Sequence, residues 1–212
     1  MKSRLAVLLF CLLLATLLVG QRFGIPILFP KEAMTSIRFG RMQGTAIFVD
    51  RHGNADVPTF ESLKRGEIIR TGSGAYASLL VGNASRLSLD ERTDVELTNL
   101  KKGQESFKLI RGRILLEHWK ETPMTLTTNF TKSFFKNGIA SFVNVDFQEQ
   151  IHIIPFEGTV VTVNLNESLG TVTKTPVRIH ETAPQAIIGF APSIEAPPTS
   201  DFYAWAREMR SD

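Results

Sequence analysis

Residues 66–97, GEIIRTGSGAYASLLVGNASRLSLDERTDVEL, are the stretch that decides the fold of this chain. Apolar side chains alternate with polar ones along it, and a Gly, Asn or Asp interrupts the alternation about every eight residues. A period of two with such interruptions is typical of short β-strands joined by tight turns. We therefore predict successive strands here. No obvious catalytic group falls in the stretch, so its role is expected to be structural.

The same alternation extends in both directions, from Ile37 to Ile179. No window before residue 199 shows the i, i+3, i+4, i+7 spacing of a helix. The pattern predicts an all-β body of roughly ten or more short strands. Turns rich in Gly and Asn are expected at residues 51–54, 136–138 and 156–158, with hairpins at the first and the last of them.

The distribution of charge argues against a nucleic-acid partner. The 212 residues include 24 basic and 21 acidic side chains. Three of the basic side chains, Lys2, Arg4 and Arg22, lie in the first 22 residues, which contain no acid, so the rest of the chain carries 21 of each sign. A nucleic-acid binder concentrates its basic excess in the folded domain. We therefore expect no nucleic-acid partner.

The chain begins with an apolar segment that predicts a membrane partner. Residues 5–20, LAVLLFCLLLATLLVG, contain no charge and follow Lys2 and Arg4. As a helix they would extend about 24 Å, between the length of a signal-peptide core and that of a transmembrane helix. No small-x-small cleavage site follows the segment. We therefore favour an uncleaved signal anchor over a cleaved signal peptide.

This anchor sets the expected layout of the chain. The basic residues before it predict that residues 1–4 form a cytoplasmic stub and that residues 5–28 form the transmembrane segment with its interfacial flank. The β domain is then expected to be periplasmic or extracellular. A stub this short has no room for a domain, so any signal would have to leave through another protein. Cys11 is the only cysteine, so no intrachain disulfide or thiolate metal site is expected.

The body is predicted to end in a linker and a short helix. Residues 182–198 contain four prolines and are expected to form a linker or an irregular wrap. Residues 199–212 then place Phe202, Trp205 and Met209 on one helical face. A stripe of this kind most often docks on its own domain, and we favour that interpretation. The alternative is a helix that binds a partner protein through these three side chains.

Residues 66–79, GEIIRTGSGAYASL, resemble the motif G-D-x-I-x-T-G-x-x-A-x-A-x-L of the FecR domain of bacterial envelope proteins. Residues 85–89, 93–97 and 107–114 then resemble the family's later strands in order and spacing. The resemblance covers residues 36–181, the whole predicted β body. It implies an exported, membrane-tethered β domain of a kind used in envelope sensing, built as a solenoid-like stack or a sandwich of short strands.

The chain departs from the family pattern in two places. The family's later step G-T-x-F-x-V is replaced by residues 138–143, GIASFV, which lack the threonine. Regulators of the iron-transport type also carry a cytoplasmic anti-sigma segment before their membrane helix, and residues 1–4 are too short for one. The resemblance therefore does not carry the sigma-factor mechanism over to this chain.

Ten residues are expected to form the signature of the fold. Gly72 and Gly74 lie where a strand pair reverses, and a backbone with positive φ is least costly at glycine. Alanines allow strand layers to approach closely, and each buried Leu stabilises the core by about 1.5–3 kcal/mol. The ten residues are Gly66, Thr71, Gly72, Gly74, Ala75, Ala77, Leu79, Leu87, Leu89 and Gly112.

No group of residues predicts catalysis, a metal site or a cofactor. The four histidines are scattered along the sequence without the spacing of metal ligands: His52, His118, His152 and His180. Ser73 has no assignable base, so it is not expected to be a nucleophile. We expect the protein not to be an enzyme and to use no cofactor.

Two further clusters have a structural and a functional interpretation. The acidic turn at residues 90–94 has too few regularly spaced oxygen ligands for calcium, so we favour a solvated turn. Trp119 with residues 134–135 could form an exposed aromatic patch for a ligand, but such side chains are more often core, which we favour.

Together these observations predict a membrane-anchored, exported β domain that binds another envelope or membrane protein, or an envelope ligand. Recognition would use exposed strand edges or turns. A structural or assembly protein of the envelope without a sensing role is the alternative. An exported carbohydrate-active hydrolase is a weaker one, since no acid/base pair is recognisable.

Overall fold

The computed structural model describes residues 33–50, 52–56, 63–145, 150–165, 170–180 and 201–208. The chain divides into two compact units, Met1–Ala33 and Met34–Asp212, and all elements below belong to the second. The predicted anchor at residues 5–28, the predicted linker at 182–198 and Met209 lie outside the described residues. Among the helices of the described residues, none is long and apolar enough to cross a membrane.

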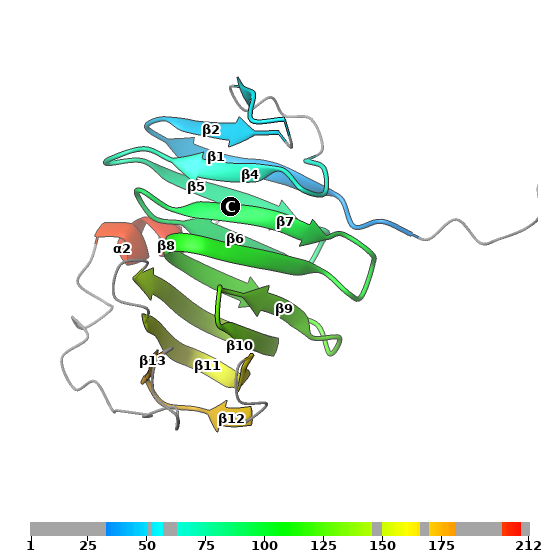
Figure 1. The fold of residues 1–212 in the computed structure, drawn as a ribbon, viewed down its shortest axis with the longest axis vertical. Helices are drawn as coiled ribbons and strands as arrows, with labels where there is room; N and C mark the ends of the chain where they lie inside the picture. The colour runs from blue at the N-terminus through cyan, green and yellow to red at the C-terminus, as the bar shows by residue number, and fades with distance from the viewer. Residues whose placement is uncertain are drawn as a thin grey trace, which may run out of the picture. The chain divides into compact units, whose positions relative to one another are not determined.

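The described part of the chain is built from strands that belong to a single sheet, together with one short helix, α2 (Asp201–Glu208), which confirms the predicted all-β body (Figure 1). Three of the strands are long, which the prediction of short strands throughout missed. The strands are β1 (Ile37–Gln43), β2 (Ala46–Val49), β3 (Ala55–Asp56), β4 (Ile68–Thr71), β5 (Tyr76–Val81), β6 (Ser85–Leu89), β7 (Asp94–Asn99), β8 (Ser106–His118), β9 (Met124–Thr127), β10 (Thr131–Val145), β11 (Gln150–Asn164), β12 (Gly170–Thr173) and β13 (Val177–His180).

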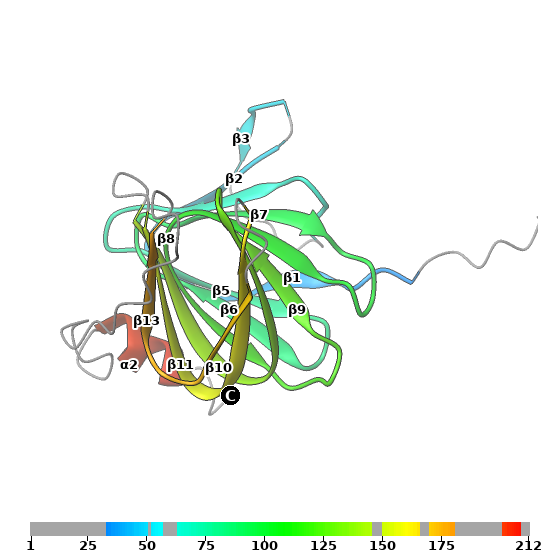
Figure 2. The ribbon, with the colours of Figure 1, turned by 60° about the horizontal axis from the view of Figure 1, so that its bottom comes forward.

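The sheet folds back on itself into two layers. Layer A runs β3-β2-β4-β7, the first part of β8, β9, the first part of β10, the second part of β11, and β12. Layer B runs β1-β5-β6, the second part of β8, the second part of β10, the first part of β11, and β13. Figure 2 shows β10 and β11 bent into U-shapes that pass from one layer to the other. The chain is therefore a stack of U-shaped units around one core.

The core lies between the layers and is formed by the alternate side chains that the period of two assigns to one face. In layer B, Leu79 pairs with Leu87, and Leu87 pairs with Leu116; in layer A, Ile69 pairs with Val95. All five are at most 1% exposed. Burial of each contributes about 1.5–3 kcal/mol relative to exposure, so the inward rows are what holds the layers together. The predicted inward positions of Ala77 and Leu89 are also confirmed.

The chain passes between the layers at two sets of corners. The upper corners are the β1–β2, β4–β5 and β6–β7 connections and Gly112 inside β8. The lower corners are the β8–β9 connection, residues 137–138 inside β10, Gly158 inside β11 and the β12–β13 connection. Residues 112 and 138 pair with the opposite ends of the β8–β10 ladder, at Asn144 and His118 respectively. The two sets therefore lie on opposite edges of the stack.

The lower corners correct the prediction of a hairpin at residues 156–158. Ile153 pairs with Phe142, and Val160 pairs with Phe135, so both arms of β11 pair with β10 and not with each other. Likewise residues 136–138 are no end of a strand, because β10 continues through them. The backbone does take positive φ there, at Asn137 and at both glycines. A Gly- or Asn-rich turn and a bend inside a long strand require the same residue types, so the sequence pattern could not separate them.

The C-terminal helix α2 packs on the outer face of layer B. Phe202, Tyr203, Trp205 and Ala206 are all at most 7% exposed. They form a second apolar cluster with Leu115 and Ile139, against which Tyr76 also packs. An isolated helix of eight residues is unstable in water, so docking is what stabilises α2. The structure supports the favoured interpretation of docking; binding of a partner through Phe202 and Trp205 would require α2 to leave the sheet.

Candidate functional site

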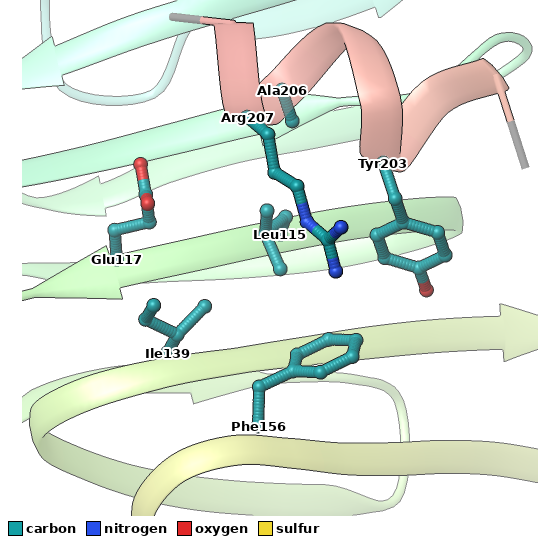
Figure 3. Close-up of a pocket in the computed structure, with 7 residues that line it drawn as sticks. All are labelled: Leu115, Glu117, Ile139, Phe156, Tyr203, Ala206 and Arg207. Carbon is teal, nitrogen blue, oxygen red and sulfur yellow. The ribbon is translucent and has the colours of Figure 1, made fainter. Parts of the chain in front are cut away.

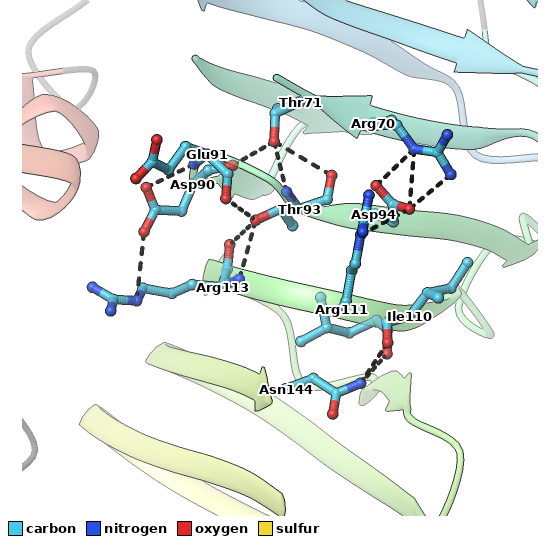
Figure 4. Close-up of polar contacts among 11 residues, drawn as sticks. Arg70, Thr71, Asp90, Glu91, Thr93, Asp94, Ile110, Arg111, Arg113 and Asn144 are labelled. Atoms are coloured by element: carbon cyan, nitrogen blue, oxygen red, sulfur yellow. Dashed lines mark hydrogen bonds and ion pairs between the residues drawn. The ribbon is translucent and has the colours of Figure 1, made fainter. Parts of the chain in front are cut away.

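The upper corners are held together by the signature residues that the sequence singled out (Figure 4). The Thr71 hydroxyl donates to the Asp90 carbonyl at 2.5 Å and accepts from the Thr93 amide at 2.9 Å. The Glu91 carboxylate accepts from the Gly74 amide at 2.6 Å. Each corner is thus bonded to the next one in the stack. These residues are occupied in structure and have little left to offer a ligand.

Gly72 corrects one expectation about these corners. Gly74 has a φ of 65° and Gly66 a φ of 84°, as a turn glycine should, but Gly72 does not have a positive φ. Its amide donates to the Thr45 carbonyl at 2.9 Å, and an added Cβ would lie 3.3 Å from that same oxygen. Gly72 is therefore favoured by the close approach of the β1–β2 connection, and not by its own backbone conformation.

At position 112, both the positive φ of the backbone and the close approach of a neighbouring segment require glycine. Its φ is 92°, and an added Cβ would overlap the backbone and side chain of Thr93. The Thr93 hydroxyl in turn bonds the backbone of Arg113, accepting from its amide and donating to its carbonyl, each at 3.1 Å. Ala75 is fully buried beneath Gly44, whose own Cβ would meet it at 2.8 Å. The small residues of the motif thus set how closely the corners stack.

The acidic turn is not the solvated turn that the sequence suggested. The Asp94 side chain is 4% exposed and lies between two guanidinium groups, 2.9 Å from Arg70 and 3.2 Å from Arg111. Asp90 lies 3.5 Å from Arg113. Burial raises the pKa of Asp90, while a backbone hydrogen bond and Arg113 act in the opposite direction. These carboxylates neutralise arginines that the strand register brings beside them, which no local sequence pattern could indicate.

The histidines whose side chains the structure describes, His52, His118 and His152, do not converge. His118 is fully buried at the lower edge, with Nδ1 2.6 Å from the Ser85 hydroxyl and Nε2 2.7 Å from the Thr122 carbonyl. That carbonyl can only accept, so Nε2 carries the proton and Nδ1 accepts from Ser85. Burial lowers the pKa of His118. Within the described ranges no three His, Cys, Asp or Glu side chains are placed to hold a metal ion.

The aromatic cluster divides between core and surface. Phe135 is fully buried, as favoured, whereas Trp119 is 47% exposed and corrects the expectation that it belongs to the core. The sequence contained a signal for this outcome. Ile114, Leu116 and His118 point inward at every second position, so Trp119, one residue later, falls on the outward phase.

Trp119 lies two residues after Glu117, which belongs to a cross-strand row on the outer face of layer B. The row is Arg38 on β1, Leu80 on β5, Arg86 on β6 and Glu117 on β8, paired in that order. These four side chains and Trp119 line a groove of about 460 Å³ together with residues 82–85. Arg86 and Glu117 form an ion pair across it at 3.8 Å. We call this the Trp119 groove.

A second, smaller cavity lies on the other side of Glu117, beneath α2. Its volume is about 130 Å³, and its walls are mainly apolar. Figure 3 shows Tyr203 and Arg207 extending from the helix toward the strands that carry Leu115, Ile139 and Phe156. We call this the α2 cavity. Glu117 lines both hollows, so they form neighbouring parts of one face.

The contacts of Tyr203 fix α2 over this cavity. Its hydroxyl donates to the Ser141 hydroxyl at 2.8 Å, and the Arg113 guanidinium lies 5.7 Å from the ring centroid. Burial raises the pKa of Tyr203, against the opposing effects of Ser141 and Arg113. Tyr76, from the signature stretch, packs on Trp205 at a centroid distance of 5.4 Å. The sequence predicted the helix but could not show that Tyr76 is one of its docking contacts.

The FecR protein family model matches residues 67–161 of this chain. No curated protein matches it. Among solved structures, two crystal structures of a protein from Parabacteroides distasonis, described as a putative anti-sigma factor, are similar to it. Each shares 12% sequence identity with the chain at a TM-score of 0.48. The match covers 54% of this chain and 55% of the solved one, so it spans about half of either protein.

Proposed function

We propose that this chain is a FecR-family protein that acts as a membrane-anchored, exported binding or signalling module of the cell envelope and performs no chemistry; the match of the FecR family model to residues 67–161 supports the proposal. The observation that carries the proposal is the family match itself. The matched residues begin just before β4 and end inside β11, so they contain three of the four upper corners and most of the core. The part of the chain that the family defines is therefore the part that folds both layers.

The expected location rests on the first residues of the sequence. Residues 5–20 are apolar without a charge, and the basic residues Lys2 and Arg4 precede them. Positive charge on this side favours an orientation in which the β domain lies outside the cytoplasm. We therefore propose a single-pass membrane protein whose β domain is periplasmic or extracellular.

The proposed recognition surface is the outer face of layer B. It holds the exposed indole of Trp119, the Trp119 groove and the α2 cavity beside one another. Large exposed aromatic side chains next to a groove are typical of interaction sites. By contrast, the charged groups of the upper corners are already paired with each other, as at Asp94 and Arg70.

In-cell photo-crosslinking tests the binding role. A photoreactive amino acid is placed at Asn83, on the rim of the Trp119 groove, in the full-length chain expressed in its native host. The control position is Lys102, an exposed turn residue that does not line the groove. A regulator or receptor captured at Asn83 but not at Lys102 supports a signalling role. Capture of wall or surface-layer components alone would instead favour a structural or assembly protein.

Membrane fractionation tests the anchor. The full-length chain is expected to stay in the membrane pellet after carbonate extraction, and a variant lacking residues 5–20 is expected not to. Recovery of the full-length chain in the carbonate supernatant would contradict the proposed anchor. A protease added to intact spheroplasts should also digest the β domain if it lies outside the cytoplasm.

A further inference from the structure

We propose that the Trp119 groove is a binding site for an acidic saccharide. The inference rests on the proposed binding function and names the class of ligand. It concerns Trp119, Arg38 and Asn83, which line the groove together with the Arg86–Glu117 ion pair. A volume of about 460 Å³ lies within the range of roughly 300–1,000 Å³ typical of small-molecule sites.

The groove contains side-chain donors that no other group of the described protein uses. Among the described residues, the Arg38 guanidinium, the Asn83 amide and the Trp119 indole N–H make no hydrogen bond or ion pair. By contrast, Arg70 and Arg111 on layer A are both engaged by Asp94. The groove therefore concentrates donors that a ligand can use without breaking contacts inside the protein.

The Trp119 indole provides a flat aromatic surface in the groove. Trp119 is 47% exposed, and its amide donates to the Ala84 carbonyl at 3.0 Å, which fixes the residue against the β5–β6 turn. An indole offers a large flat apolar face with one polar N–H at its edge. A pyranose ring has the matching pattern, with a face of C–H groups and a rim of hydroxyls. Exposed Trp beside polar side chains is therefore suited to a sugar ring.

The charged side chains that line the groove favour an acidic ligand. Arg38 and Arg86 supply two positive charges and Glu117 one negative charge, so the lining has an excess of one positive charge. A guanidinium binds a carboxylate through charge-assisted, often bidentate hydrogen bonds. Arg38 is the exposed one of the two arginines and is placed for a ligand carboxylate. Glu117 can accept hydrogen bonds from ligand hydroxyls.

The pairing of the strands beneath the groove favours a saccharide over an acidic peptide. The floor of the groove is formed by β5, β6 and β8, and each of these strands already pairs with a neighbour on both sides. An extended peptide commonly binds by adding a strand to a free sheet edge. These three strands offer none, and the edge of β1 beside Arg38 is partly occupied, because the Ile37 carbonyl accepts from the Leu63 amide at 2.9 Å. Recognition must therefore use side chains, which suits a ligand without a backbone ladder.

Fluorescence offers a direct test, because the chain has only two tryptophans and the structure places them differently. Trp205 is 7% exposed, whereas Trp119 is 47% exposed. In a Trp205→Phe variant, emission reports on Trp119 alone; in a Trp119→Phe variant, it reports on Trp205 alone. Trigalacturonate and N-acetylmuramic acid serve as acidic probes, and chitotriose is the uncharged control. Titration calorimetry on the wild-type chain repeats the measurement without substitution.

A saturable blue shift is expected in Trp205→Phe with at least one acidic probe and not in Trp119→Phe. Arg38→Gln should weaken binding about tenfold through loss of a charge-assisted hydrogen bond. Arg41→Gln, which removes another exposed arginine of β1 outside the groove, should change affinity by no more than roughly twofold.

Four results would overturn the proposal. They are no binding of either acidic probe up to about 10 mM, equal affinity for chitotriose, equal effects of Arg38→Gln and Arg41→Gln, or tighter binding of a poly-glutamate peptide than of the saccharides. Any of these would leave the family-based binding role intact if crosslinking at Asn83 still captures a regulator. Failure of the site and failure of the proposed function are thus separate outcomes.

Discussion

The upper and lower corners solve the same problem in different ways. Both sets carry the chain from one layer to the other. At three of the four upper corners a short strand ends, and side chains such as Thr71 and Glu91 bond one corner to the next. At the lower corners β10 and β11 run on without a break, and an added Cβ at Gly138 would collide with the backbone of Glu157. Close packing at glycine is common to both sets, and the upper set adds side-chain hydrogen bonds between its corners.

The change between the two sets occurs after β8. The β8–β9 pair is the one parallel pair among the described strands. Every other pairing there is antiparallel, because each U-shaped unit reverses direction. Residues 119–123 connect β8 to β9 and make the first crossing at the lower edge. Trp119 is therefore the first residue of the connection at which the corner type changes.

The largest expected effect is at a lower corner. Gly138→Ala should cost about 3 kcal/mol or more, because it adds steric overlap with Glu157 to an unfavourable φ of 153°. Gly53→Ala is the matched control: its φ is 84°, but no atom lies within 4 Å of the added Cβ, so we expect about 1 kcal/mol. Urea unfolding of both variants gives the comparison. Equal midpoints would show that close packing is not what the lower corners require.

A smaller loss is expected at an upper corner. Thr71→Val keeps the shape of the side chain but leaves the Thr93 amide without its hydroxyl acceptor, at a cost of about 2 kcal/mol. Thr125→Val, on the outer face of layer A and half-buried, should change stability by less than about 0.5 kcal/mol. If the two variants unfolded at the same denaturant concentration, side-chain bonds would not be what joins the upper corners.

The two edges should also respond to pH with opposite sign. Burial lowers the pKa of His118, at the lower edge. Below the unfolded pKa of about 6.5 the unfolded chain binds a proton that the folded chain does not. The free energy of unfolding therefore decreases as the pH is lowered, until the folded pKa is reached. Burial raises the pKa of Asp90, at an upper corner, so protonation of the folded chain adds stability as pH falls through that pKa.

Separating the two contributions requires one variant. His118→Gln should remove the loss of stability between pH 7 and pH 5.5, which for a single group cannot exceed about 1.4 kcal/mol per pH unit. The measurement is the unfolding free energy at several pH values for wild type and variant. A variant that loses as much stability as wild type over this interval would rule out His118 as the source.

The smallest effect is expected where α2 bridges the two regions. Trp205 contacts Tyr76, beside an upper corner, and Tyr203 donates a hydrogen bond to Ser141 on β10, the strand that bends at a lower corner. Tyr203→Phe should cost about 1 kcal/mol, because Ser141 keeps its bond to the Ile114 carbonyl. Hydrogen exchange of the α2 amides should rise slightly, and that of β6 and β7 should not. Faster exchange throughout the sheet would mean that α2 stabilises the whole domain.

The strands β4 to β7 could largely be predicted from the sequence, and the long strands β10 and β11 could not. Strands β4 to β7 fall where the alternation of residues 66–97 placed them, and Thr71, Ala77, Leu79, Leu87 and Leu89 are buried as expected. The glycines of β10 and β11 were assigned to turns, although they bend continuous strands. Local pattern identifies where the backbone needs glycine, but not whether the flanking segments pair with each other.

The candidate site was hardest to predict. The sequence favours a core position for Trp119, and Arg38, Arg86 and Glu117 carry no local signal. These three side chains come from three strands far apart in the sequence and meet only through register. In the same way Asp94 gains its arginines from β4 and β8. Residues that recognise a ligand across strands share no sequence spacing, because pairing alone sets their distance.

The sequence by itself determined that the described body is all-β, which side chains form its core, that a short helix follows it, and which family it resembles. Those features depend on local periodicity and on the residue types that turns and cores require. Only the tertiary structure decided which strands pair, where the layers cross, that α2 rests on Tyr76, and that a groove forms beside Trp119. These depend on contacts between segments distant in the chain, and a period of two is the same whichever neighbour a strand finds.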